Sequence, residues 1–311
     1  MGPIDVQRTL QKPVTFDGHG LHSGSAARMV LHPSAANTGI VFRRTDLSPA
    51  INMLPARFDH VTVSPLNTRL ENEFGTSILT IEHIMAALAG CGVHNALICV
   101  DGPEVPIMDG SARAFVRRIV EAGIDEQPVP LRAIQMLETV RVIEGDRRAS
   151  LAPATGLQIS FAIDFTDAAI GRQSKTLNMA NGSFVRELAD SRTFCRASDI
   201  DMMRAQGKAL GGTLENAVVV DGAQVLTPGG LRHSDEAVRH KMLDALGDLY
   251  TAGAPILGRF EAERGGHALT NALLRKVFSQ PQSWKWVTCD AGTAARLPGV
   301  GVTKADLVAV A

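Results

Sequence analysis

The sequence has few aromatic residues and almost no excess charge. Phe, Trp and Tyr together make up 5% of its 311 residues, and the formal net charge is -1. The aromatic residues other than Phe are Trp284, Trp286 and Tyr250. Because a protein that holds nucleic acid needs a basic surface and usually aromatic stacking platforms, this composition argues against a nucleic-acid partner.

Cysteines and long apolar runs are also scarce. The four cysteines, Cys91, Cys99, Cys195 and Cys289, show no C-x-x-C spacing, and a chain of this size does not need disulfides for its stability. No run of about 18 apolar residues occurs, and the N-terminus lacks a basic stretch followed by an apolar one. We therefore expect a soluble, cytoplasmic protein with no transmembrane segment.

The length suits two domains of ordinary size, with a site between them. Residues 125–130 carry two acids and two prolines, and we place the boundary there. The predicted division is an N-terminal domain at 1–127, a C-terminal domain at 131–278 and a partly ordered terminal appendage at 279–311.

Each half of the chain predicts strands followed by helices, which indicates an α+β fold. In the first half, strands are expected at 30–31 and 39–43, a helix capped by Thr80, and a second helix after residue 111 with Phe115, Ile119 and Val120 facing inward. In the second half we expect strands at 140–142, 157–165 and 216–220, a short helix at 183–188 and a long helix at 234–250.

Three short segments carry the chemistry. Helical spacing places His240, Asp244 and Asp248 on one face, Glu82 adjoins His83, and His267 follows two glycines that should expose it in a turn. A catalytic zinc site usually has three protein ligands, a set that His83, His240 and Asp244 would supply.

Glu82 and His267 would then be the proton-transfer groups. A glutamate beside a ligand is suited to act as general base, and an imidazole titrates close to working pH and suits a general acid. Asp248 would raise the pKa of His267 if it points toward that ring, and Thr193 could steady an oxyanion.

Each of these patterns also has a purely structural interpretation. A histidine and an aspartate one helical turn apart commonly share a surface hydrogen bond, a Glu-His pair suits a helix start, and Gly-Gly-His is ordinarily a turn. The spacing alone therefore leaves a zinc hydrolase and a set of structural residues both open.

Six dispersed motifs resolve this choice by resemblance. They are Gly20-Leu21-His22-Ser23-Gly24, Thr80-Ile81-Glu82-His83, Pro106-Ile107-Met108-Asp109-Gly110-Ser111, Ser191-Arg192-Thr193-Phe194, Val238-Arg239-His240-Lys241-Met242-Leu243-Asp244 and Gly266-His267-Ala268-Leu269. In this order, over about residues 7 to 278, the chain resembles the UDP-3-O-acyl-N-acetylglucosamine deacetylases, zinc amidases that commit material to lipid A.

This resemblance implies a fold and a set of roles. Two similar domains, each a β-sheet with two main helices, would stack with the helices sandwiched between the sheets. His83, His240 and Asp244 would bind Zn²⁺. Glu82 would be the general base, His267 the general acid, Asp248 its partner and Thr193 an oxyanion donor.

The resemblance also implies contacts for an acylated nucleotide sugar, a substrate that hints at work near the inner leaflet of a membrane. Lys241, within the catalytic site, and Arg264 would meet the diphosphate, Phe165 would cover the uracil, and Phe194 would pack on the sugar. The acyl chain would be sheathed by Leu21, Ile200, Ala209 and Leu214, with His22 near the entrance.

Two positions depart from the family pattern. Arg264 stands where many members have lysine, which keeps the charge, so the phosphate contact should survive. Asn67 stands where the position is often apolar or cysteine, which bears on the width and polarity of the acyl passage. Two alternatives remain at this point: a zinc amidase that acts on another acylated amine, and an inactive nucleotide-sugar binding module.

Overall fold

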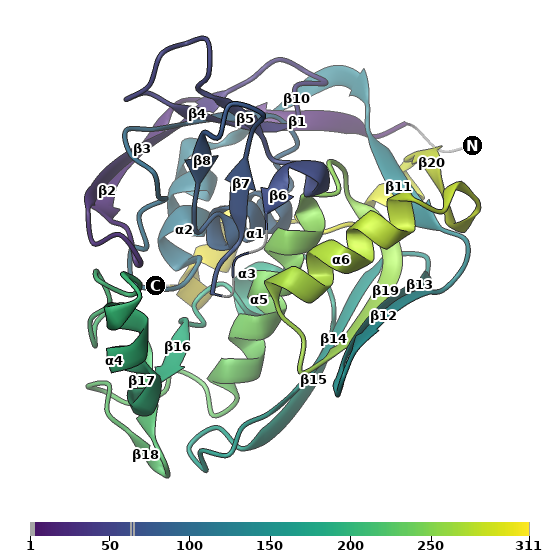
Figure 1. The fold of residues 1–311 in the computed structure, drawn as a ribbon. Helices are drawn as coiled ribbons and strands as arrows, with labels where there is room; N and C mark the ends of the chain where they lie inside the picture. The colour runs from purple at the N-terminus through teal and green to yellow at the C-terminus, as the bar shows by residue number, and fades with distance from the viewer. Residues whose placement is uncertain (1–3, 63, 65, 311) are drawn as a thin grey trace.

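Two main β-sheets enclose a layer of helices in the computed structural model, which describes residues 4–62, 64 and 66–310 (Figure 1). One sheet belongs to the first half of the chain and the other to the second half. The predicted α+β architecture of two sheets with helices between them is confirmed.

The first sheet has five strands and is antiparallel except where β4 runs parallel to β9. In spatial order they are β2 (Val14–His19), β3 (Ala26–Pro33), β9 (Ala96–Val100), β4 (Ile40–Arg44) and β5 (Met53–Pro55). Along β3, Ala27, Met29 and Leu31 alternate with more exposed residues and enter the core. Because every second side chain of a strand points to the same side, one face of the sheet is directed toward the helices.

Two helices cover that sheet: α1 (Glu82–Cys91) and α2 (Arg113–Ala122). Every residue of α1 is buried, because the helix lies between α2 on one side and the second half of the chain on the other. The inward side chains predicted for α2, Phe115, Ile119 and Val120, are all buried.

The start of α1 differs from the prediction. Ile81 is the N-cap residue of α1, and no side chain forms a capping hydrogen bond with the helix. Thr80 has a left-handed backbone, with a φ of 63°, and its hydroxyl donates to Glu104 Oε1 at 2.7 Å. The prediction that Thr80 caps the helix is therefore wrong, because this hydroxyl is used in a buried network instead.

The second sheet has seven strands, with β19 at its centre. They are β12 (Val140–Glu144), β13 (Arg147–Pro153), β19 (Ile256–Glu263), β11 (Arg132–Met136) and β20 (Trp284–Thr288), with β14 (Leu157–Asp164) and β15 (Arg172–Asn178) completing it beside β19.

Helices α5 (Glu236–Tyr250) and α6 (His267–Phe278) pack on this sheet and on each other. Helix α5 also crosses α1, and the crossing is very close at Gly247. A Cβ atom there would lie 2.0 Å from the backbone oxygen of Glu82. Glycine at this position therefore sets the distance between the two helices, which come from different halves of the chain.

The predicted domain boundary and the predicted appendage both contain paired strands. The predicted boundary run forms most of β10 (Ile124–Pro130), which is antiparallel to β1 (Val6–Leu10). Within the predicted appendage, β20 pairs with β11, so this part of the segment is an ordered strand of the second sheet.

Smaller elements lie around the helix layer on several sides (Figure 1). The remaining strands form two three-stranded sheets: β6 (Val61–Thr62), β7 (Arg69–Glu71) and β8 (Ser77–Ile78), then β16 (Phe194–Arg196), β17 (Val218–Asp221) and β18 (Gln224–Val225). Short helices are α3 (Ser183–Glu187), α4 (Ala197–Ala205), α7 (Ala291–Ala294), and three 3-10 helices at Phe58–His60, Pro281–Ser283 and Lys304–Val310. None of the helices in the described part of the chain has both the length and the apolarity needed to cross a bilayer.

Candidate metal centre and active site

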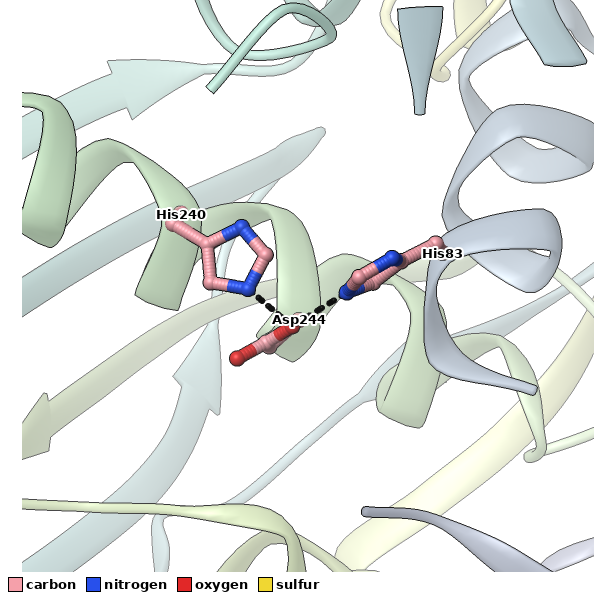
Figure 2. Close-up of side chains that lie close together, drawn as sticks. All are labelled: His83, His240 and Asp244. Atoms are coloured by element: carbon pink, nitrogen blue, oxygen red, sulfur yellow. Dashed lines mark ion pairs between the residues drawn. The ribbon is translucent and has the colours of Figure 1, made fainter. Parts of the chain in front are cut away.

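Three buried metal-ligand side chains meet where α1 and α5 cross. His83 comes from α1, and His240 and Asp244 lie one turn apart on α5 (Figure 2). Asp244 Oδ1 lies 3.3 Å from His240 Nε2 and 3.6 Å from His83 Nε2. The structure thus brings together the three residues predicted as a ligand set.

The geometry and chemistry of this cluster fit a zinc ion. Donor atoms of a tetrahedral site with bonds of about 2.0–2.1 Å lie about 3.3–3.4 Å apart. Asp244 Oδ1, between the two imidazoles, is buried and has no hydrogen-bond partner. An unpaired buried carboxylate oxygen is costly, and a cation at this point would satisfy it.

Protonation states favour metal binding as well. Burial lowers the pKa of His240 to about 4, so its ring is neutral at pH 7 and keeps a lone pair. Burial alone would raise the pKa of Asp244, but His240 and Lys241 outweigh it and hold that pKa well below its usual range. Both groups are therefore in their ligating forms.

A backbone carbonyl orients the ring of His240. Its Nδ1 lies 3.0 Å from the oxygen of Ser191, so Nδ1–H donates there and Nε2 faces Asp244. The segment that carries Ser191 is fixed by a buried ion pair between Arg192 and Glu236, 2.9 Å apart. Since Glu236 begins α5, this pair ties the segment to the ligand helix.

Glu82 and His267 lie beside the cluster. His267 Nε2 is 3.9 Å from Glu82 Oε1 and 3.9 Å from Asp244 Oδ2. Burial raises the pKa of Glu82, although the charges of His267 and His83 oppose this. A carboxylate with a raised pKa and an imidazole at its side form an arrangement suited to moving protons.

The ring of His267 is paired with Asp248, whose Oδ2 lies 2.8 Å from Nδ1. Burial by itself would lower the pKa of His267, but the charge and hydrogen bond of Asp248 raise it to about 9. His267 is not exposed in a glycine turn as we expected. It is the first residue of α6, and only 10% of its side chain is accessible.

A cavity of about 660 Å³ opens onto these groups. Its lining includes the predicted substrate and oxyanion residues Leu21, His22, Phe165, Thr193, Phe194, Ile200, Ala209, Leu214 and Lys241. Phe165 and Phe194 meet edge to face with their centroids 5.4 Å apart. The cavity thus joins a polar, metal-binding floor to aromatic and aliphatic walls.

Comparison with known proteins gives the family. The family model described as UDP-3-O-acyl N-acetylglycosamine deacetylase matches residues 7–279. The chain belongs to this family. It is 48% identical to the UDP-3-O-acyl-N-acetylglucosamine deacetylase of Phenylobacterium zucineum (strain HLK1) over 279 residues, which are 90% of this chain and 95% of that protein.

Other relatives agree. The deacetylase of the same name from Shewanella frigidimarina (strain NCIMB 400) is 47% identical over 286 residues, with 91% of this chain and 93% of that protein covered. The one from Pasteurella multocida (strain Pm70) is 45% identical, with the same two shares covered. The resemblance stated from the six motifs is confirmed.

Arg264, predicted to meet a diphosphate, is not among the cavity-lining residues of this family member. Its guanidinium lies 2.6 Å from both Asp146 and Asp164. Lys241 does line the cavity, and its Nζ donates to Asp244 Oδ2 at 2.8 Å. Three further cations also reach the lining, and the sequence patterns did not identify them: Arg147, Arg196 and Arg204.

Asn67 does not line the cavity either. It accepts from Ser64 Oγ at 2.5 Å and donates to Thr80 Oγ1 at 3.0 Å. Thr80 in turn donates to Glu104, which also accepts from the backbone N–H groups of residues 22 and 23. The amide of Asn67 therefore belongs to the network that holds the loop carrying His22.

The sequence reasoning also missed Glu104 and Thr68, both buried near the catalytic groups. Glu104 lies two residues before the motif that runs from Pro106 to Ser111, and an acid at the start of this largely apolar stretch could have drawn attention to it. Thr68 follows Asn67 in a segment with no recognisable pattern. Its contacts are visible only in three dimensions.

Proposed function

We propose that the chain is a Zn²⁺-dependent deacetylase that hydrolyses the 2-acetamido group of UDP-3-O-acyl-N-acetylglucosamine. The products are acetate and the free 2-amino sugar, in the committed step of lipid A biosynthesis. One observation carries this proposal: His83, His240 and Asp244 converge beside Glu82 and His267 at the floor of one cavity. Relatives bearing the name of this activity cover almost the whole chain.

A zinc ion held by His83, His240 and Asp244 would act as a Lewis acid on the amide carbonyl and lower the pKa of a water. Glu82 is the general base that accepts a proton from the attacking water, since its carboxylate lies in the same pocket with a raised pKa. His267 gives a proton to the departing amine, because Asp248 keeps the ring charged. Thr193, on the cavity wall, stabilises the developing oxyanion.

The cavity walls sort the parts of the substrate. Phe165 covers the uracil and Phe194 packs on the sugar, while Leu21, Ile200, Ala209 and Leu214 enclose the acyl chain. Lys241 and Arg264 remain our candidates for the diphosphate. Arg264 must then exchange one of its aspartate partners for phosphate, a bidentate acceptor of the same kind.

We place the reaction in the cytoplasm. All four cysteines are free, as expected for a reducing compartment. An inactive binding module is disfavoured, because structural zinc sites usually have four protein ligands and this cluster has three.

Acetate release from the acylated nucleotide sugar tests the proposal. The protein freed of metal by a chelator should lose activity, and added Zn²⁺ should restore it. Full activity in protein shown by elemental analysis to be metal-free would overturn the role of zinc. A substrate without the acyl chain serves as the comparison, and equal turnover of both would favour an amidase for other amines.

A further inference from the structure

Thr68 lies between β6 and β7 and contacts three functional groups at once. It is 2% exposed. Its backbone N–H donates to Glu82 Oε2 at 3.0 Å, and its hydroxyl lies 2.5 Å from Asp248 Oδ1 and 3.1 Å from His267 Nδ1. These contacts connect the candidate base, the candidate acid and the partner of that acid.

The hydrogens in this cluster can be assigned from donor and acceptor counts. A carboxylate only accepts, so the single hydroxyl proton of Thr68 goes to Asp248 Oδ1. The Thr68 oxygen is then left as an acceptor, which means that the nitrogen facing it must be an N–H. His267 Nδ1–H therefore points between Asp248 Oδ2, at 2.8 Å, and Thr68 Oγ1.

This assignment fixes which nitrogen of His267 faces the reaction. With Nδ1 always protonated, the exchangeable proton is the one on Nε2, the atom that lies 3.9 Å from Glu82 Oε1. If the hydroxyl were absent, Asp248 Oδ1 would lose this donor, and its carboxylate could turn about the Cβ–Cγ bond away from the ring.

We propose that Thr68 is a positioning residue of the active site. Its hydroxyl holds the Asp248 carboxylate in the plane that keeps His267 Nδ1 protonated, and its backbone N–H holds Glu82 opposite Nε2. The expected effect of Thr68 on turnover rests on the proposed function. Its structural part, the protection of the Nδ1 proton, stands independently of any activity.

Two substitutions separate the hydroxyl from the rest of the residue. Thr68→Val keeps the shape and the backbone N–H but removes the hydroxyl, whereas Thr68→Ser keeps the hydroxyl. In the zinc-loaded protein we expect Thr68→Val to lower kcat for acetate release about 10- to 100-fold with KM within threefold. Thr68→Ser should stay within about threefold of the parent kcat.

A spectroscopic readout complements the kinetics. The protein is labelled with ¹⁵N-histidine, and the NMR signals of His267 are identified because they are lost in His267→Gln. The Nδ1 proton should exchange with water at least about tenfold faster in Thr68→Val than in Thr68→Ser.

Thr9→Val is the matched control. It removes another buried hydroxyl, which donates to the oxygen of Asn95 far from the site, and should change neither readout.

Each outcome decides the proposal. Equal rates of Nδ1 proton exchange in the valine and serine variants would overturn the proposal. A valine variant with the parental kcat, or one in which only KM changes, would also overturn it. If Thr68→Val does not fold, Thr68→Ala takes its place in both measurements. Absence of deacetylase activity in the parent protein would contradict the proposed function, while the proton exchange would still test Thr68.

Discussion

His240 and His267 both lie on the cavity floor, but different influences decide the pKa of each. His240 becomes a neutral donor because burial dominates. His267, in the same layer, keeps its charge because Asp248 faces it at 2.8 Å. Two histidines of the same cavity floor are thus prepared for different tasks, ligation and proton donation.

Glu82→Gln tests the proton-transfer role of a single side chain. The amide keeps the size of the carboxylate and still accepts from the Thr68 N–H, but it cannot take a proton. We expect kcat to fall by roughly two to four decades while the protein still binds one equivalent of zinc, as measured by acetate release and elemental analysis.

The control for this substitution is Glu121→Gln, which changes an exposed glutamate paired with Arg117 on the outside of α2. It should leave turnover unaltered. Turnover within tenfold of the parent in Glu82→Gln would contradict a role for this carboxylate as general base.

The local sequence motifs predicted the position of some site residues correctly and that of others incorrectly. His240 and Asp244 share one helix, so their spacing alone brings them to one side. Thr80 was wrongly assigned as a cap, because its hydroxyl bonds to Glu104, a partner 24 residues away. Arg264 has its two aspartates 118 and 100 residues away. Such distant partners leave no periodic signal.

The crossing of α1 and α5 determines whether the ligands meet at all. His83 stands on one helix and His240 and Asp244 on the other, so the distance between the helix axes sets the size of the cluster. Gly247 allows the backbone of α5 to touch the first turn of α1. Elsewhere on α1, Gly90 makes room for the ring of Phe184 in α3, since a Cβ at Gly90 would lie 2.0 Å from that ring.

Gly247→Ala should therefore damage both stability and metal binding. The added methyl group meets a backbone oxygen, which cannot rotate away, and overpacking of this kind costs about 1–3 kcal/mol. Denaturant unfolding should show this loss, and a competitive metal indicator should show weaker zinc binding.

Gly292→Ala in α7 is the matched control, because the nearest atom to its new Cβ lies 3.7 Å away. It should be neutral or slightly stabilising, since alanine is the better helix former. Equal zinc affinity in the parent and in Gly247→Ala would show that the crossing tolerates a wider spacing.

The long periodic elements were predictable and the irregular ones were not. Helix α5 was expected at 234–250 and is found at Glu236–Tyr250. Helix α6 was missed, although Leu269, Leu273 and Val277 recur at helical spacing, because the Gly-Gly-His sequence favoured a turn. Strand β10 carries prolines, which suit an edge strand as well as a linker.

The segment that follows β20 packs against the body of the molecule. Beyond β20, Cys289, Ala294 and Leu297 form a second buried cluster with Leu131, Ala133 and Leu257. Gly299 lies so close to Gly92 that a Cβ there would be 2.0 Å from the Gly92 nitrogen. This segment covers the end of α1 and so supports the helix that carries His83.

Leu297→Ala tests this contribution to the whole fold. Leu297 is 1% exposed, and truncation of a buried leucine costs about 2–5 kcal/mol. Thermal unfolding should therefore begin at a clearly lower temperature. Val308→Ala, at a residue 80% exposed, should leave the Tm unaltered, and an equal Tm for Leu297→Ala would show that the segment is dispensable.

The division of the ligand set between α1 and α5 gives the proposed ion a mechanical role. An ion held by one ligand from α1 and two from α5 would join the two sheet-and-helix layers. Removing the zinc with a chelator should then lower the denaturant concentration at which the protein unfolds, because the layers lose a connection between them.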